Sequence, residues 1–502
     1  MYTLLTGATG LVGRYLVRDL LLNEHNLAVV VRTSRRQTPV ERMEEILQHW
    51  EKELGRALPR PVVLSGDICE PGFGFSESDQ EWVRSHCNRI IHSAAILEFY
   101  GKDRTQEPWR TNLNGTQNMI ALCRDLGIRD IHYVSTAYVA GNQDQLVMED
   151  QLDVGQTFRN DYEESKFMAE SLVRRIDFAD HVTVYRPAVI SGDSRTGYTN
   201  TYHGMYLYLR LMAMMIPTIP PSEDGKRHTP IRLQMTGDEL RNIIPVEWVS
   251  AVMTRLLETP EARGLTFHIA PEKPSRSGDI IDYCGEYFGS TGVQFCGHDA
   301  ELEPVQREDN EDQWMFERMC KENMETYAPY ERTDNRFDLT NLKRFAGDIH
   351  CPEIDRTVVH RYIDYGNEDR WGKRRPQVTE PSFLVEEYLT ELRRSRATLP
   401  DDSEPCTVSG LDICGPGGLQ LTLSVNAAGA IRIDRGLPND ESLPILKLTT
   451  EEFALIVSSP SQGSSVLTAA AELAGISAPA EFAESLQSHL QHEETPHEIQ
   501  TA

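Results

Sequence analysis

The first thirty-one residues contain the pattern that most constrains the fold. An apolar segment over residues 2–6 leads into Thr6-Gly-Ala-Thr-Gly-Leu-Val-Gly13, an apolar-periodic helix follows over residues 11–22, and a β-branched strand follows over residues 27–31. Glycines at intervals of three allow a tight turn, a close approach of backbone to a pyrophosphate, and close packing of helix on strand. The pattern therefore predicts a β-α-β unit that binds a dinucleotide, with a glycine-rich turn that binds nothing as the alternative.

Short apolar runs alternate with helical segments through the next 150 residues, which is typical of a parallel sheet covered by helices on both faces. We therefore predict an α/β fold, a doubly wound parallel (Rossmann) sheet. The alternation weakens from about residue 190, where irregular segments of the kind that build substrate sites begin. The further strands are expected at residues 61–64, 89–92, 131–134, 181–185 and 265–270, and a helix is expected over residues 242–249.

Composition divides the chain. The last 102 residues hold three basic and fifteen acidic side chains and no Trp or Tyr, so we expect a domain boundary near residues 399–404. This tail reads as a small α+β module, with strands at 419–425, 430–434 and 443–448 and helices at 450–457, 465–474 and 480–490. The expected domains are 1–270 (cofactor binding), 271–400 (a mostly helical, substrate-binding extension), 401–492 (the acidic module) and 493–502 (a frayed tail).

Charge and cysteine usage exclude several classes of protein. With 50 Lys and Arg against 77 Asp and Glu, the net charge of −27 argues against a nucleic-acid partner. The nine cysteines show no CxxC and no zinc-ligand spacing, so no metal site is predicted. The most apolar stretch, residues 205–221, is interrupted by Arg210 and by three prolines, so we expect no transmembrane segment and a cytoplasmic location.

Three arginines follow the second predicted strand, where a site for NAD would usually offer a carboxylate to the ribose. Arg32, Arg35 and Arg36 suit a 2′-phosphate, so NADPH is favoured over NADH, and a solvated basic loop is the alternative. After the third strand, Asp67-Ile68 is predicted to contact the adenine, although an Asp there is often only a helix cap.

A phenol and an amine lie four residues apart at Tyr162 and Lys166, which puts both on one face of a predicted helix. Alone, the pair fits any exposed amphipathic helix. The hydroxyls of Ser135-Thr136 end the fifth predicted strand, about one helical connection upstream. The three groups are therefore expected to converge at the C-terminal edge of the sheet, where nucleotides bind.

Together these features resemble the extended short-chain dehydrogenase/reductase superfamily, over residues 1–270. The resemblance implies that Tyr162 is the general acid, that Lys166 holds the nicotinamide ribose and lowers the phenol pKa, and that Thr136, rather than Ser135, hydrogen-bonds the reacting carbonyl. The pieces that carry it are Thr6-Gly-Ala-Thr-Gly-Leu-Val-Gly13, His92-Ser-Ala-Ala95, Asn112-Leu-Asn-Gly-Thr116, Val134-Ser-Thr-Ala-Tyr-Val139, Tyr162 with Lys166, Arg186-Pro187 and Pro245-Val-Glu-Trp-Val249. The cofactor contacts that it implies are Thr6, Gly7, Gly10, Leu11, Val12, Gly13, Ala94, Ala95, Asn112, Tyr162, Lys166 and Pro187.

Within that superfamily the chain is similar to fatty acyl-CoA reductases and to the thioester-reductase domains of carboxylic acid reductases. The tail resembles a sterol-carrier-type lipid-binding domain, with a packing or dimerisation module as the alternative. The pieces shared with the reductase branch are His92-Ser-Ala-Ala-Ile-Leu-Glu-Phe99, Ser135-Thr-Ala-Tyr-Val-Ala-Gly141, Tyr185-Arg-Pro-Ala-Val-Ile-Ser-Gly192, Gly197, Tyr327-Ala-Pro-Tyr330 and Arg336-Phe-Asp-Leu-Thr-Asn341.

The resemblance implies NADPH-dependent reduction of a long-chain acyl thioester, with the acyl chain expected along residues 198–220. Three points stay open: acyl-CoA or acyl-carrier protein as the partner, aldehyde or alcohol as the product, and the oligomeric state. One alternative is a sterol or sugar-nucleotide dehydrogenase or epimerase of the same superfamily. Another is a redox-silent protein that senses NADP or carries lipid.

Overall fold

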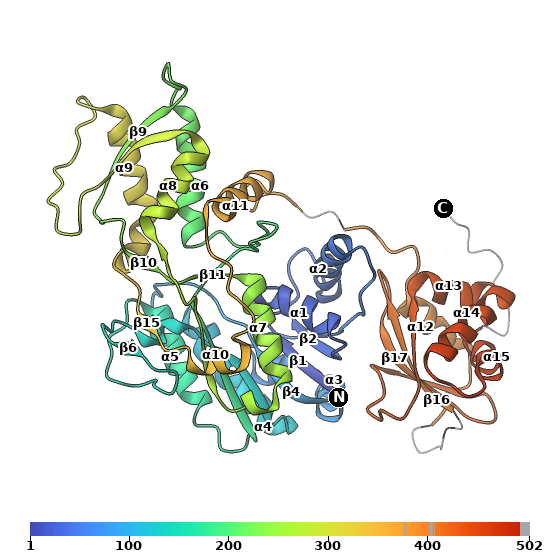
Figure 1. The fold of residues 1–502 in the computed structure, drawn as a ribbon. Helices are drawn as coiled ribbons and strands as arrows, with labels where there is room; N and C mark the ends of the chain where they lie inside the picture. The colour runs from blue at the N-terminus through green and yellow to red at the C-terminus, as the bar shows by residue number, and fades with distance from the viewer. Residues whose placement is uncertain (376–377, 401–404, 406, 492–502) are drawn as a thin grey trace.

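The computed structural model describes residues 1–375, 378–400, 405 and 407–491. Figure 1 shows three regions in the described chain: a central sheet with its helices, a region of helices and short strands above it, and the C-terminal segment beside it. The predicted tail over residues 493–502 and most of the predicted boundary near residues 399–404 lie outside the described residues.

The central sheet has seven strands in the order β3-β2-β1-β4-β5-β7-β12, and all of its neighbouring strands run parallel. The predicted doubly wound sheet is thereby confirmed. The order reverses between β1 and β4, which is the point where such sheets bind nucleotides. The strands are β1 (Tyr2–Thr6), β2 (Leu27–Val31), β3 (Val62–Ser65), β4 (Cys87–His92), β5 (Asp130–Val134), β7 (His181–Pro187) and β12 (Thr266–Ile269).

Each face of the sheet packs its own set of helices. The apolar side chains of α1, α2 and α7 form one core with the sheet, and those of α3, α4 and α5 form the other. Burial on both faces explains why these strands are continuous apolar runs rather than alternating ones. The helices are α1 (Leu11–Leu22), α2 (Pro39–Leu54), α3 (Glu77–His86), α4 (Gly115–Leu126), α5 (Asp161–Val173) and α7 (Val246–Glu258), and the short turns are η1 (Pro71–Gly74), η2 (Arg110–Asn114), η3 (Ala137–Ala140) and η5 (Pro260–Ala262).

The helix predicted over residues 242–249 is wrong in its first half. Residues Ile243–Pro245 form β11, which pairs in parallel with β8 (Val189–Ser191), and α7 begins only at Val246. Ile243 and Ile244 are β-branched and buried, and Pro245 sits at the N-cap, where its missing N–H costs no intrahelical bond.

The region above the carboxyl edge of the sheet has its own apolar core. This core combines residues 206–243 with residues 280–363, so chain from both sides of position 270 builds it. Its elements are α6 (Met205–Met215), η4 (Ile216–Thr218), β9 (Arg227–Leu233), α8 (Ser277–Phe288), β14 (Ser290–Phe295), α9 (Glu311–Met324) and α11 (Arg356–Glu368). The elements that join it to the sheet are β6 (Leu146–Val147), β10 (Leu240–Arg241), β13 (Ser275–Arg276), η6 (Glu325–Tyr330), β15 (Arg336–Phe337) and α10 (Thr340–Ala346).

The C-terminal segment contains a four-stranded sheet in the order β18-β17-β16-β19, packed against helices that share its apolar core. Its first strand, β16, was not among the predicted elements, and α14 begins five residues earlier than predicted. The strands are β16 (Thr407–Cys414), β17 (Gln420–Val425), β18 (Ile431–Arg435) and β19 (Ile445–Thr449), and the helices are α12 (Val385–Ser395), α13 (Thr450–Ser458), α14 (Pro460–Leu473) and α15 (Pro479–Leu490).

This C-terminal segment packs on the amino end of β1 and on α3. The Tyr2 hydroxyl donates to Gln420 Oε1 at 2.8 Å and accepts from the Leu437 amide at 2.7 Å. Trp82 Nε1 donates to the Arg435 carbonyl at 2.7 Å, and the Arg435 guanidinium lies over the Trp82 ring. Since the nucleotide edge lies at the other end of β1, these contacts are remote from it.

Two properties of the described residues bear on function. No described helix combines the length and the apolar character needed to cross a membrane. Within the same part of the chain, no three His, Cys, Asp or Glu side chains gather as a metal site would require.

Tyr2→Phe tests the contact between the two parts. It removes one oxygen and leaves the buried Leu437 amide and Gln420 oxygen without this partner, so the free energy of unfolding should fall by about 1–3 kcal/mol. Urea denaturation measures it. Tyr100→Phe is the matched control. That residue is 53% exposed, so removing its hydroxyl should change the free energy of unfolding by about 0.5 kcal/mol or less. Equal effects of the two variants would show that the contact does not stabilise the chain.

Candidate active site

The glycine-rich turn forms one wall of a cavity at the carboxyl edge of the sheet. Gly7 has a φ of +77°, and a Cβ there would lie 2.7 Å from the Ala94 amide nitrogen, so both the conformation and the space require glycine. Helix α1 begins at Leu11 without a side-chain cap at Gly10 and without an acidic residue in its first turn. The backbone N–H groups of its first turn therefore have no side-chain partner and face the cavity, which is the arrangement of an anion-binding site.

The predicted cofactor contacts separate into two groups. Gly7, Gly10, Leu11, Val12, Gly13, Ala95, Tyr162, Lys166 and Pro187 line the cavity, whereas Thr6, Arg32, Arg35, Arg36, Asp67, Ile68, Ala94 and Asn112 do not.

Members of the second group have internal partners. Thr6 Oγ1 contacts His92 Nδ1 at 2.9 Å, and Asn112 joins the 96–101 loop to α5 through Ile96 and Ser165. Asp67 caps a turn at Cys69 and lies 3.7 Å from Arg32, and the Ile68 carbonyl accepts from Asn118. Thr6 and Asn112 thus hold the loops that shape the cavity, but they do not form part of the cavity wall.

A cluster of arginines lies beside the glycine-rich turn. Arg32, Arg35 and Arg36 are all exposed, as a loop open to a ligand would be. Arg42 of α2 was missed by the sequence analysis: it donates to the Arg32 carbonyl at 2.7 Å and to Thr9 Oγ1 at 3.2 Å. Its guanidinium therefore bridges the end of β2 and the turn, and only the pitch of α2, which begins at Pro39, could have suggested this position.

The three predicted catalytic side chains line the same cavity. Thr136 follows β5 and caps η3, Tyr162 lies in the first turn of α5, and Lys166 lies one turn further along that helix. Ser135 also lines the cavity, but its hydroxyl donates to the buried Glu170 carboxylate at 2.6 Å. Thr136 is thus the hydroxyl that this geometry leaves for a substrate.

Lys166 is anchored to the central sheet. Its amine donates to the Val134 carbonyl at 2.8 Å and to the Tyr133 hydroxyl at 3.1 Å, and it lies over the Tyr133 ring. Burial lowers the pKa of Lys166 to about 7, and the Glu170 carboxylate offsets part of this shift.

Tyr162 shows the opposite effect of burial. Burial raises the pKa of Tyr162 to about 12, and the Thr136 hydroxyl offsets part of the rise. We expected Lys166 to lower the pKa of this phenol, and in this structure burial outweighs any such effect. The amine is directed to Tyr133 and Val134 instead, so Tyr162 is a protonated phenol at neutral pH.

A buried ion pair lies behind Lys166. Glu170, one turn further along α5, receives two bonds at 2.7 and 3.1 Å on Oε1 from Arg186 of β7 and is also bonded by Arg174. Although burial alone would raise it, the Arg186 guanidinium holds the pKa of Glu170 below its ordinary value. These bonds fix the rotation of α5, and with it the faces on which Tyr162 and Lys166 lie.

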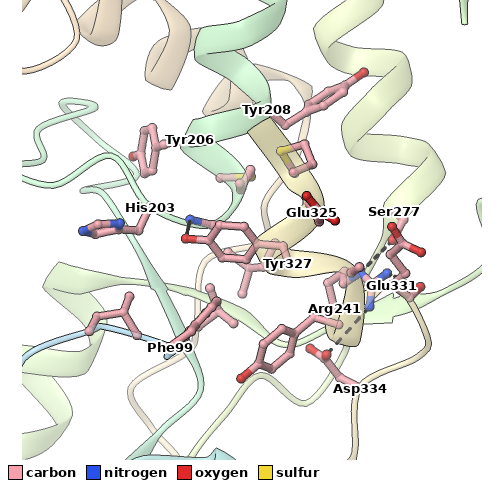
Figure 2. A pocket seen from close by; sticks show the side chains of 18 of the residues that line it. Phe99, His203, Tyr206, Tyr208, Arg241, Ser277, Glu325, Tyr327, Glu331 and Asp334 are labelled. Carbon is pink, nitrogen blue, oxygen red and sulfur yellow. Dashed lines mark hydrogen bonds and ion pairs between the residues drawn. The ribbon is translucent and has the colours of Figure 1, made fainter. Parts of the chain in front are cut away.

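The cavity has a volume of about 1300 Å³ and extends from the glycine-rich turn to the region above the sheet. Figure 2 shows Phe99, His203, Tyr206, Tyr327 and Arg241 among the side chains that line the cavity, with Asp334 beside Arg241. Of the predicted acyl stretch 198–220, only residues up to Tyr208 line it, and Met212 and Met215 lie in the core. Further apolar lining comes from Met205, Ile231, Leu233, Ile280, Ile281 and Met324.

An aromatic cluster that the sequence analysis did not place at the site lies next to Tyr162. The Phe99 ring is 6.4 Å from the Tyr162 ring, 5.1 Å from Tyr327 and 5.5 Å from Tyr330, measured between centroids. Tyr138 joins the cluster through Tyr330 at 5.8 Å. The tyrosines of the quoted Tyr327-Ala-Pro-Tyr330 motif thus lie beside the predicted acid.

Two solved structures share the fold of the greater part of the chain. The terminal R domain of the myxalamid PKS-NRPS pathway superimposes with a TM-score of 0.58 at 23% identity, over 75% of this chain and 92% of its own. A thiolation-reductase di-domain of an archaeal non-ribosomal peptide synthetase gives a TM-score of 0.54 at 19% identity, over 74% and 76%.

Curated relatives match part of the sequence. A non-canonical nonribosomal peptide synthetase of Aspergillus hancockii is 23% identical over 385 residues, which is 72% of this chain and 36% of the relative. A linear gramicidin synthase of Brevibacillus parabrevis is 25% identical over 72% of this chain and 7% of its own length. A putative fatty acyl-CoA reductase of Drosophila melanogaster is 35% identical over 182 residues, 35% of this chain and 32% of the relative.

The chain thus spans little more than a third of these relatives at most. The family described as male sterility protein, an NAD-binding family, matches residues 5–253. This matched region, which holds the glycine-rich turn, Thr136, Tyr162 and Lys166, belongs to the male sterility protein family, and the greater part of the chain shares its fold with the R domain.

Proposed function

We propose that the chain is an NADPH-dependent reductase of a long-chain acyl thioester, borne by coenzyme A or by a carrier protein. One observation carries this proposal: Thr136, Tyr162 and Lys166 line a single cavity that joins an anion-binding turn to an apolar chamber. A hydride acceptor with a long apolar tail fits such a cavity. The names of the relatives, which include peptide synthetases and a putative fatty acyl-CoA reductase, favour the same class.

The residues present fit the cofactor. A Cβ at Gly7 or Gly13 would clash with backbone, so these glycines allow the tight turn at the start of α1, and Arg32 with Arg42 offers guanidinium groups for a 2′-phosphate. Lys166 has a third N–H beyond its two internal bonds, which suits a ribose hydroxyl. NADPH, when bound, supplies the hydride.

The side chains of this chain supply the proton and the charge stabilisation. Tyr162 is a neutral phenol at pH 7, so it can donate a hydrogen bond and then its proton to the thioester carbonyl oxygen as negative charge develops there. Thr136 donates a second hydrogen bond to that oxygen. The hemithioacetal formed by addition of the hydride and this proton then breaks its C–S bond, releasing the aldehyde and the free thiol.

The apolar chamber would hold the acyl chain, since burial contributes about 0.8 kcal/mol per methylene. A volume of about 1300 Å³ exceeds that of a usual single-ligand pocket, about 300–1,000 Å³, so nicotinamide and acyl chain can share it. The apolar side chains of Met205, Ile231, Leu233 and Ile280 favour an acyl chain over a sugar, although charged side chains such as Arg232, Arg241 and Lys321 also line the cavity. A redox-silent role leaves the grouping of Thr136, Tyr162 and Lys166 unexplained.

We also propose the predicted division into residues 1–270, 271–400 and 401–492. The first two of these units share the apolar core above the sheet, which residues from both sides of position 270 build. The separate apolar core of the C-terminal segment supports its treatment as a unit. A lipid ligand for that unit and a cytoplasmic location for the protein remain predictions.

Loss of NADPH absorbance at 340 nm tests the proposed reaction. Purified protein should consume NADPH with palmitoyl-CoA and release free thiol, with one NADPH used for each thiol when the aldehyde is the product and two when the alcohol is, because one C–S bond breaks in either case. A fatty aldehyde, a sterol ketone and a UDP-sugar are offered separately. Turnover with the sterol or the sugar but not with the thioester would contradict the proposal.

Tyr162→Phe tests the acid. It keeps the ring and removes the proton donor, so kcat should fall by about 10²–10⁴-fold while NADPH still binds within about twofold. Stopped-flow single turnovers measure the hydride step, and NADPH fluorescence measures binding. Tyr100→Phe is the control, because that ring is 53% exposed and is not among the residues that line the cavity. Near-normal kcat in Tyr162→Phe would remove this residue from the mechanism.

Arg42→Ala and Arg32→Ala test the phosphate site. Each removes a charge-assisted bond to a 2′-phosphate, worth about 1.5–3 kcal/mol, so the Kd for NADPH should rise about 10- to 100-fold while that for NADH is unchanged. Fluorescence titration with both cofactors measures this. Arg56→Ala, on the exposed end of the α2 region, is the control. Equal losses for the two cofactors would contradict the assignment.

Binding of NADPH should take up a proton. With a pKa of about 7, Lys166 is mostly neutral at pH 8, and a bound ribose and pyrophosphate favour the ammonium, so affinity should fall as pH rises above 7. Calorimetry at pH 8 in two buffers of different ionisation enthalpy should give an uptake approaching about one proton per chain. Tyr162→Phe should retain the uptake and Lys166→Met should lose it. Binding enthalpies independent of the buffer would contradict this assignment.

A further inference from the structure

The first turn of α5, which carries Tyr162, is held by residues on both of its sides. Asn160 caps the helix by accepting from the Glu163 amide at 3.0 Å, and the Asp161 amide donates to the Phe99 carbonyl at 2.9 Å. Glu163 is fully buried beside Arg159, whose Nη1 donates to its carboxylate at 3.0 Å. Tyr162 lies between these residues, so its position depends on them.

Tyr330 of η6 reaches this turn from the region above the sheet. Its hydroxyl donates to Glu163 Oε1 at 2.7 Å and accepts from Asn160 Nδ2 at 2.8 Å. The Arg159 guanidinium lies over its ring at 5.2 Å, and Phe99 and Tyr138 pack on the ring as well. One oxygen atom thus joins η6 to the residues that precede and follow Tyr162.

The two ends of η6 are fixed to other parts of the site. At its start, Tyr327 accepts from the amide of Gly204, the residue that caps α6. Just after its end, Arg241 donates to the carbonyls of Glu331 and Arg332. Figure 2 shows Tyr327 and Arg241 at the cavity. The segment therefore connects the apolar chamber, through α6, with the start of α5.

We infer that Tyr330 is a positioning residue for Tyr162: through Asn160 and Glu163 it holds the first turn of α5 so that the phenol meets the substrate carbonyl. A general acid must lie within hydrogen-bond reach of the atom that it protonates, and an error of about 1 Å can cost about 100-fold in rate. This inference rests on the proposed function and extends it, since it assigns the reaction a residue whose hydroxyl is bonded to Asn160 and Glu163 and acts through them.

Tyr330→Phe keeps the ring contacts and removes only the shared oxygen. We expect faster amide hydrogen exchange across residues 159–163 in the variant, measured by mass spectrometry without any ligand. The matched control is Tyr287→Phe, which also removes a tyrosine bond to a carboxylate, at 2.6 Å to Asp364, but far from α5. Unchanged exchange in Tyr330→Phe would overturn the inference, whatever substrate the protein reduces.

Kinetics supply the second measurement. In Tyr330→Phe, kcat with palmitoyl-CoA should fall about 10- to 100-fold, with the Kd for NADPH unchanged within about twofold and with a larger solvent deuterium isotope effect on kcat, because proton donation becomes slower. A variant that merely folds poorly would lower the active fraction, titrated with NADPH, without changing the isotope effect. A wild-type isotope effect together with wild-type kcat would overturn the inference and leave the proposed function standing. No turnover in the wild type would instead contradict the proposed function, and the exchange measurement would still decide on Tyr330.

Tyr327→Phe separates the two tyrosines. It frees the Gly204 amide at the start of α6, so its effect should appear in KM for the long-chain thioester, with kcat changed less than in Tyr330→Phe. Combining Tyr330→Phe with Glu163→Gln should cost less than the sum of the single changes, since both act through one contact. Additive effects in that cycle would contradict the path through Glu163.

Discussion

The bond between the Lys166 amine and the Val134 carbonyl is the contact on which the site depends. It ties helix α5 to the end of β5, at the edge where the glycine-rich turn also opens. One turn further along, the Glu170–Arg186 ion pair ties the same helix to β7. Rotating or sliding α5 would break this pair and leave its charges buried without a partner, which is costly. Since Tyr162 and Lys166 share one face of α5, fixing the helix fixes both groups at once.

Burial sets the chemistry of those groups in opposite directions. The same apolar surroundings that raise the pKa of the Tyr162 phenol lower that of the Lys166 ammonium, because each shift favours the neutral form. At neutral pH Tyr162 therefore keeps its proton, whereas Lys166, with a pKa of about 7, can gain or lose one. In the proposed reaction, hydrogen bonds from Thr136 and Tyr162 to a carbonyl oxygen would gain strength in these buried surroundings.

The sequence predicted the central sheet because each of its parts has a local signature. Glycine spacing, buried strands and the Tyr162–Lys166 interval all lie within short windows, and the confirmed doubly wound order follows from their alternation. Arg42 and Tyr330 lacked such a signature. Arg42 meets Thr9 only through the packing of α2 on the turn, and Tyr330 meets Glu163 across 167 positions of chain. The helix predicted through Ile243–Pro245 failed for a related reason, since pairing with β8 is invisible in the local pattern. The pKa of Tyr162 also follows from burial in three dimensions, which no spacing reports.

The contact of the C-terminal segment with Tyr2 and Trp82 places that segment at the opposite end of β1 from the turn at Gly7. A strand of five residues is about 16 Å long, and its full length separates this contact from the reacting groups. None of the described residues of the segment lines the cavity, so anything that the segment binds lies apart from Thr136, Tyr162 and Lys166. A different domain that covered Tyr2 and Trp82 equally well would therefore leave the walls of the cavity unchanged.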